Sequence, residues 1–122
     1  PSGPGFYYPP TVLTDVRKGM AAYREELFGP VASIIPVKDE KAAIRVANDT
    51  SYGLGAAVFT RDVARGERIA TYELQAGAAF VNAFVKSDPR LPFGGIKESG
   101  FGRELSRHGL LEFQNVKSVF VR

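Results

Sequence analysis

The middle of the chain alternates between two patterns of apolar and polar positions. Three short runs are mostly apolar and predict strands: residues 31–37, 53–60 and 78–84. Residues 53–60 are continuously apolar, as in a strand that is buried on both faces. The segments between these runs place apolar side chains three and four residues apart, the spacing of an amphipathic helix, and each follows an aspartate suited to an N-cap, Asp39 or Asp62. Strands and helices in alternation predict an α/β fold, a three-layer parallel sheet with right-handed crossover helices.

The flanking segments carry weaker patterns. Residues 6–13 combine aromatic and β-branched side chains with two prolines, which restrict them to an edge strand or an extended segment. The pattern predicts a short helix over residues 19–28 that ends at Gly29, and a last helix over residues 103–113. Residues 116–121 are β-prone but have no hairpin partner, so we expect them to pair with a strand outside the chain or in another subunit.

Length and composition indicate an ordinary globular protein. A chain of 122 residues is long enough for one modest core, which predicts a single compact unit. No apolar run reaches the roughly 20 residues that cross a bilayer, and the first residues lack the pattern of a signal peptide, so we expect a cytoplasmic protein with no membrane partner. Because the sequence starts at Pro1 without a methionine, we expect it to be cut from a longer protein.

Charge and reactive side chains exclude several classes of function. The net charge is +3, with 7 basic and 6 acidic residues in positions 1–61 and 9 and 7 in positions 62–122, so no basic patch indicates a nucleic-acid partner. The absence of cysteine excludes disulfides, thiolate metal sites and thiol nucleophiles, and we expect no metal site. The one histidine, His108, lies in the predicted last helix and is assigned no role.

A glycine-rich segment follows the third predicted strand. Ligands of parallel sheets bind beyond the carboxyl ends of the strands, which makes residues 85–102 the first place to look for a site. Glycines 94, 95, 100 and 102 permit positive φ and close backbone approach. Their spacing fits neither a P-loop nor a dinucleotide fingerprint, so spacing alone favours a structural loop.

Five segments, in order along the chain, resemble motifs of the aldehyde dehydrogenase superfamily. Two are its signatures, EELFGPV at residues 25–31 and LPFGGIKESGFGRE at residues 91–104. The others are GFYY at residues 5–8, ANDTSYGLGAAVFT at residues 47–60 and EFQNVK at residues 112–117. The resemblance spans nearly the whole chain, which is identified as the C-terminal part of an NAD(P)-dependent aldehyde dehydrogenase, most similar to the succinate-semialdehyde dehydrogenases.

The resemblance implies roles for particular residues. Glu26 matches the carboxylate that accepts hydrogen bonds from the nicotinamide ribose of NAD or NADP, and Phe28 matches an aromatic residue beside the nicotinamide. On the predicted helix, Glu25 points away from Glu26. Phe93 matches a wall of the aldehyde tunnel, and Ser87, six residues earlier, matches the serine that binds the substrate's distal carboxylate in succinate-semialdehyde dehydrogenases.

Arg90 could complete such a carboxylate clamp, although its setting close to Pro89 and Pro92 gives no geometric support. The family's nucleophilic cysteine, general-base glutamate and cofactor-binding domain would all precede this chain, which is therefore expected to be inactive alone.

The resemblance also implies a domain organisation. Residues 1–110 would form the C-terminal part of the catalytic domain, and residues 111–122 an oligomerisation strand that builds a homodimer or homotetramer. Succinate semialdehyde is the expected small-molecule substrate. Two alternatives stay open: a dehydrogenase of a neutral aldehyde, and a noncatalytic dimerisation module. The sequence leaves the choice between NAD and NADP undecided.

Overall fold

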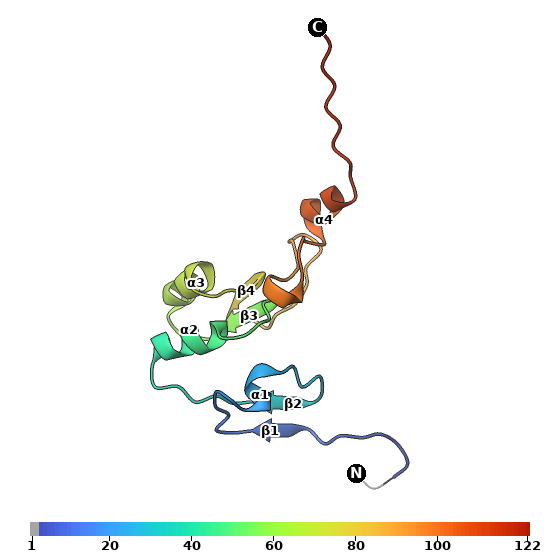
Figure 1. Cartoon of the computed structure of the whole chain (residues 1–122). Coiled ribbons are helices and arrows are strands. Elements are labelled where there is room, and N and C mark those ends of the chain that lie inside the picture. The colour runs from blue at the N-terminus through green and yellow to red at the C-terminus, as the bar shows by residue number, and fades with distance from the viewer. Residues whose placement is uncertain (1–2) are drawn as a thin grey trace. The chain divides into compact units, whose positions relative to one another are not determined.

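The computed structural model describes residues 3–122 and divides the chain into two compact units, Pro1–Ala43 and Ile44–Arg122. The prediction of a single compact unit is therefore wrong. Each unit closes its own pair of parallel strands, so each has its own local set of backbone hydrogen bonds. Figure 1 labels the helices and strands of both units.

The first unit is built on two short strands with a helical turn between them. Strand β1 (Thr11–Leu13) pairs in parallel with β2 (Val31–Ser33), in the register Thr11↔Val31. Helix α1 (Ala21–Arg24) lies in the connection. Val16, only 3% exposed, is a buried apolar residue of this unit. Within residues 6–13, only the part after the two prolines forms a strand, and the part before it has no regular structure. This agrees with the predicted edge strand or extended segment.

The helix predicted over residues 19–28 is much shorter than expected. It ends at Arg24, because Glu25 is already extended at φ −101° and ψ 145°. Gly29 is therefore not its stop signal. Only the four residues Ala21–Arg24 are helical, and a single turn gains little from helix propensity.

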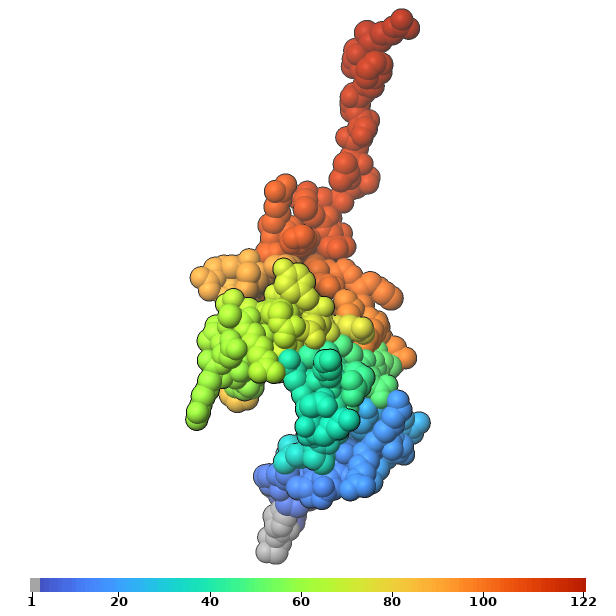
Figure 2. Space-filling model, turned by 90° about the vertical axis from the view of Figure 1, so that its left-hand side faces the viewer, coloured from blue at the N-terminus to red at the C-terminus, as the bar shows by residue number. Residues whose placement is uncertain are grey.

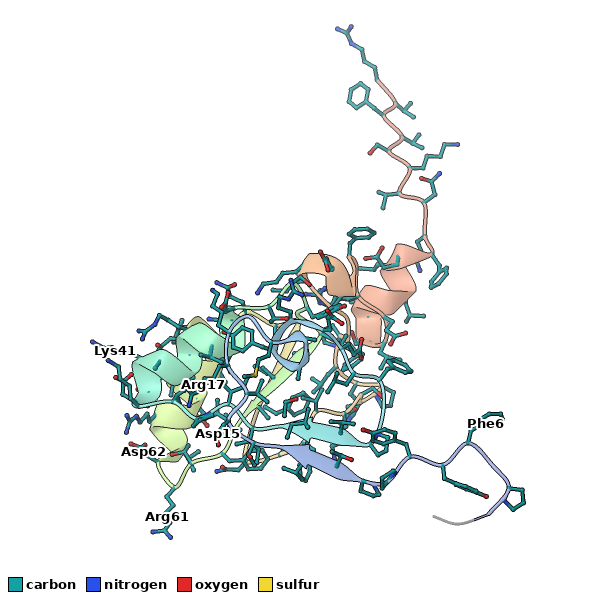
Figure 3. All side chains as sticks on the ribbon, turned by 60° about the horizontal axis from the view of Figure 1, so that its bottom comes forward. Phe6, Asp15, Arg17, Lys41, Arg61 and Asp62 are labelled. Atoms are coloured by element: carbon teal, nitrogen blue, oxygen red, sulfur yellow. The ribbon has the colours of Figure 1, made fainter. Side chains whose placement is uncertain are left out.

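The second unit contains the strand, helix, strand crossover that the apolar pattern predicts. Strand β3 (Gly55–Val58) pairs in parallel with β4 (Ala78–Val81), and α3 (Val63–Tyr72) connects them and packs on both. Gly66 and Ile69 are the buried residues of α3. Asp62, labelled in Figure 3, caps α3 through its side chain, which accepts a hydrogen bond from the Arg65 N–H at 3.0 Å.

Helix α2 (Glu40–Asn48) spans the boundary between the units and has the predicted limits. The Asp39 carboxylate accepts from the Ala42 N–H at 2.7 Å, which confirms the predicted N-cap. The strands differ from expectation in their pairing. They form two two-stranded parallel sheets, rather than one sheet through residues 31–37, 53–60 and 78–84: β2 pairs with β1, and β3 pairs with β4.

The C-terminal part of the second unit is less regular. A 3₁₀ turn, η1 (Lys97–Ser99), lies in the glycine-rich loop, and α4 (Ser106–Glu112) is the last helix, beginning three residues later than predicted. Residues 113–122 then run as one exposed trace without a strand partner among the residues described (Figure 2). Of the helices in residues 3–122, none has the length and apolar character to cross a membrane.

Candidate functional site

The first group of candidate residues follows α1. Glu26 is exposed and lies in irregular backbone, so the expected helical separation of Glu25 from Glu26 is wrong. The two carboxylates are nevertheless distinguished by their neighbours, since Arg24 Nη2 donates to Glu25 Oε1 at 3.4 Å.

Phe28 has an unusual backbone conformation, with φ 44°. A bulky side chain in the left-handed region is an outlier that surrounding structure must hold in place, and such outliers gather at binding sites. The ring is 91% exposed and borders a hollow of about 410 Å³ that Tyr8, Leu13 and Pro30 also line. The exposed ring offers an aromatic face to a flat ligand.

The second group lies in the loop between β4 and the glycine-rich segment of the second unit. Ser87 is exposed and Phe93 is half-buried. Both ends of this loop are fixed by hydrogen bonds, so Ser87 and Phe93 belong to one anchored segment.

Asn82 anchors the start of the loop. Its side-chain amide accepts from the Thr60 N–H and donates to the Thr60 carbonyl, both at 2.8 Å, and its own N–H donates to Val58 O at 2.8 Å. These bonds continue the β3-β4 pairing by one step while φ of 52° turns the chain out of the strand. Sequence reasoning missed this role, although an asparagine directly after an apolar strand was the signal, since asparagine tolerates positive φ.

Phe93 is fixed at the other end by an isolated antiparallel bridge. Its N–H donates to Glu104 O at 2.9 Å, and the Glu104 N–H donates to Phe93 O at 2.8 Å. The Phe93 ring borders a hollow of about 500 Å³ that Phe101 and Phe113 also line. A half-buried aromatic wall held by paired backbone bonds can position an apolar substrate chain.

The glycine-rich signature is tied to the end of α2 and the loop after it. The Lys97 ammonium donates to the carbonyls of Asn48 and Thr50 at 2.9 and 3.0 Å. Ser99 Oγ accepts from the Gly53 N–H at 3.0 Å, and Ile96 N–H donates to Gly53 O at 3.0 Å. A cation at a helix C-terminus is favourable. These bonds fix the glycine-rich segment to the end of α2, which is the structural role that the spacing of its glycines favours.

Arg90 is held by its own loop. Its guanidinium donates to both carboxylate oxygens of Asp88, from Nε to Oδ1 at 3.0 Å and from Nη2 to Oδ2 at 2.7 Å. Hydrogen bonds from the Arg90 side chain, and then from its backbone, keep the pKa of the Asp88 carboxyl below its ordinary value. The same pairing raises the pKa of Arg90.

The predicted site residues thus fall into two pairs: Glu26 and Phe28 in the first unit, Ser87 and Phe93 in the second. His108 is exposed in α4. Within three positions of Ser87 along the chain, the charged residues are Lys86, Asp88 and Arg90, and Asp88 is paired with Arg90.

The chain matches the aldehyde dehydrogenase family model over residues 1–119 and therefore belongs to the aldehyde dehydrogenase family. It is 52% identical over 120 residues to Succinate-semialdehyde dehydrogenase (NADP(+)) 1 of Mycobacterium ulcerans, covering 98% of this chain and 26% of that protein. It is 50% identical over 119 residues to Succinate semialdehyde dehydrogenase (NAD(P)+) Sad of Escherichia coli, with the same coverage. The chain thus spans about a quarter of the length of these relatives.

Solved structures have the same fold. A Mycobacterium tuberculosis aldehyde dehydrogenase complexed with NAD+ superposes with a TM-score of 0.91 at 43% identity, over 97% of this chain and 24% of that one. A structure that gives insights into cofactor and substrate selection by Gox0499 superposes with a TM-score of 0.91 at 52% identity, over 97% and 26%. The predicted α/β class with parallel strands is confirmed, as is the resemblance to this family.

Proposed function

We propose that this chain forms part of an NAD(P)-dependent dehydrogenase that oxidises succinate semialdehyde to the dicarboxylic acid. The observation that carries the proposal is the loop of residues 82–93, which presents an exposed serine six residues before an anchored aromatic wall. Relatives at about 50% identity named as succinate-semialdehyde dehydrogenases support this substrate.

Glu26 and Phe28 would hold the nicotinamide end of the cofactor. The exposed Glu26 can offer carboxylate oxygens to two neighbouring ribose hydroxyls, which is a charge-assisted interaction. The open ring of Phe28 fits the flat nicotinamide. When bound, the cofactor would accept the hydride from the substrate. Relatives are named for NADP(+) or NAD(P)+, so both cofactors enter the proposal.

Ser87 and Phe93 would select the substrate. Phe93 would lie along the carbon chain, and the Ser87 hydroxyl would donate a hydrogen bond to the distal carboxylate. This arrangement orients the aldehyde carbon, and orientation accounts for a large part of enzymatic rate.

The test is Ser87→Ala in the full-length enzyme, with Ser33→Ala as a control at an exposed serine of the first unit. Loss of one charge-assisted hydrogen bond, about 1.5–3 kcal/mol, should lower kcat/KM for succinate semialdehyde by about tenfold to a hundredfold. Propanal, which has no carboxylate, should lose little. Equal losses for both aldehydes would contradict the role of Ser87 and favour a neutral-aldehyde enzyme.

The bond-breaking chemistry would come from residues outside this chain. The chain has no cysteine, so it lacks the thiol nucleophile that aldehyde oxidation in the family requires. We expect the purified 122-residue chain to leave NAD+ unreduced in the presence of succinate semialdehyde. An increase in absorbance from reduced cofactor would refute this expectation, and a parent gene with no cysteine codon would favour the noncatalytic module.

Residues 1–110 would complete the catalytic domain, and residues 111–122 would pair with a sheet of another subunit in a homodimer or homotetramer. Val116, Val119 and Phe120 are strongly exposed in the isolated chain, which supports a strand awaiting a partner. Phe120→Asp should reduce the mass of the assembly in light scattering, whereas Arg122→Asp should leave it unchanged. An intact oligomer with Phe120→Asp would contradict this role.

A further inference from the structure

We propose that Arg90 is a charge mask: it neutralises the Asp88 carboxylate beside Ser87 and so allows an anionic substrate to reach that serine. This inference rests on the proposed function, because it concerns how the loop of residues 82–93 tolerates a carboxylate. It makes Arg90 a positioning residue that acts through Asp88, and not a ligand of the substrate.

The mask is built into a tight turn. Leu91 N–H donates to Asp88 O at 2.9 Å, which closes a turn with Pro89 at its second position, where proline is favoured. Asp88 Oδ1 also accepts from the Arg90 N–H at 2.9 Å, an Asx-turn that orients the aspartate side chain over its own backbone. The carboxylate therefore has one fixed position directly after Ser87.

The turn is anchored to the helix that follows the glycine-rich loop. Ser106 N–H, at the start of α4, donates to Pro89 O at 3.0 Å. The Asp88 side chain is 26% exposed, and the Arg90 side chain is 86% exposed. The negative charge is thus partly enclosed and rigid, while the guanidinium covers it from the solvent side.

The local charges explain why a mask matters. The Asp88 carboxyl is ionised at neutral pH with or without Arg90, because an ordinary aspartate already titrates far below pH 7 and the bonds from Arg90 lower the pKa of this carboxyl further. An uncovered carboxylate next to Ser87 would repel a substrate carboxylate, with Lys86 as the nearby opposing charge. Arg90 has Nε and Nη2 bonded to Asp88, and a direct contact of its remaining N–H groups with the substrate is the alternative that the double variant tests.

The experiment compares four forms of the full-length enzyme: the wild type, Arg90→Ala, Arg90→Lys and the double variant Asp88→Asn with Arg90→Ala. Each is assayed with succinate semialdehyde and with butanal, at low and at high ionic strength. Arg90→Ala should raise KM for succinate semialdehyde about threefold to tenfold, as expected for one unit charge at close range near a surface. Its kcat and its butanal kinetics should stay within about twofold.

Two rescues identify the charge as the cause. Arg90→Lys loses the two-point contact with Asp88 but keeps the positive charge beside it, so its KM should stay within about twofold of the wild-type value if charge is the cause. The double variant removes both charges, keeps an amide oxygen for the Asx-turn, and should also restore KM. High ionic strength should reduce the rise in KM caused by Arg90→Ala, because salt screens exposed charges, with a screening length of about 10 Å at 0.1 M.

The results that overturn the mask are distinct from those that overturn the proposed function. Equal losses for both aldehydes in Arg90→Ala would make Arg90 a purely structural residue. An Arg90→Ala defect that the double variant fails to rescue would make Arg90 a direct ligand. An unchanged KM in Arg90→Ala would also refute the mask, while selective loss in Ser87→Ala would leave the proposed function standing. An unselective Ser87→Ala refutes the proposed function itself.

Discussion

Gly77→Ala should disrupt the close approach of the residue before β4 to the glycine-rich loop. A methyl group at position 77 would lie 1.7 Å from the carbonyl oxygen of Gly94 and 3.1 Å from Gly95 Cα, both of which are backbone atoms. Backbone cannot rotate away as a side chain does, so the loop must shift by about 1.7 Å to reach an ordinary contact of about 3.4 Å. The Gly77 N–H bond to Gly53 O, at 2.9 Å, lies at the same point.

The size of the effect combines overpacking with the weakening of two hydrogen bonds. Overpacking costs about 1–3 kcal/mol, and the two bonds to Gly53 O, from Gly77 and Ile96, contribute about 1 kcal/mol each. Alanine also restricts the unfolded chain, which offsets about 0.4–1 kcal/mol. The net destabilisation is therefore about 2–4 kcal/mol.

Amide hydrogen exchange in the full-length enzyme is the suitable assay. Peptides covering residues 77–81 and 93–97 should lose protection by roughly 30-fold to 900-fold, the equivalent of about 2–4 kcal/mol. Gly29→Ala is the matched control, because a methyl group there meets only Leu27 O at 3.7 Å and Gly29 has no positive φ. Exchange of Gly77→Ala at wild-type rates would refute the close approach of these two backbones.

Three further substitutions test single interactions by thermal unfolding of the full-length enzyme. Asn82→Ala removes two bonds to Thr60 and places alanine at φ 52°, so it should destabilise by about 2–3 kcal/mol, and an unchanged melting temperature would refute the anchor. Lys97→Met removes two bonds to carbonyl groups and should lower the free energy of unfolding by about 1–2 kcal/mol. An unchanged melting temperature would mean that the ammonium is merely solvated. Asp62→Ala should cost about 1 kcal/mol as a lost N-cap, while Arg61→Ala, exposed at the same turn, should be neutral (Figure 3).

The sequence predicts best where a local rule decides the structure. Helix α2 has the predicted limits because Asp39 caps it and its apolar spacing is regular. The same holds for α3 and Asp62. Strands β3 and β4 are shorter than the apolar runs that predict them, since apolar content indicates burial and does not mark where pairing stops.

The failures have tertiary causes. Residues 19–28 have helical composition, yet the chain leaves the helix at Glu25 and reaches a positive φ at Phe28, which no propensity indicates. The partner of β2 is β1, a pairing that depends on the connection through α1 and not on either strand's own pattern. The roles of Asn82 and Lys97 depend on residues 22 and 47–49 positions away, so no local window could contain them.

The bridge between Phe93 and Glu104 couples the start of α4 to the loop of residues 82–93. Glu104 holds the aromatic wall, Ser106 holds the turn at Pro89, and α4 begins at that same Ser106. Any displacement of the first turn of α4 must either break these bonds or carry the loop with it. Movement of α4 is therefore coupled to the segment that carries Ser87. A subunit bound to residues 113–122 would then also change how tightly that segment is held.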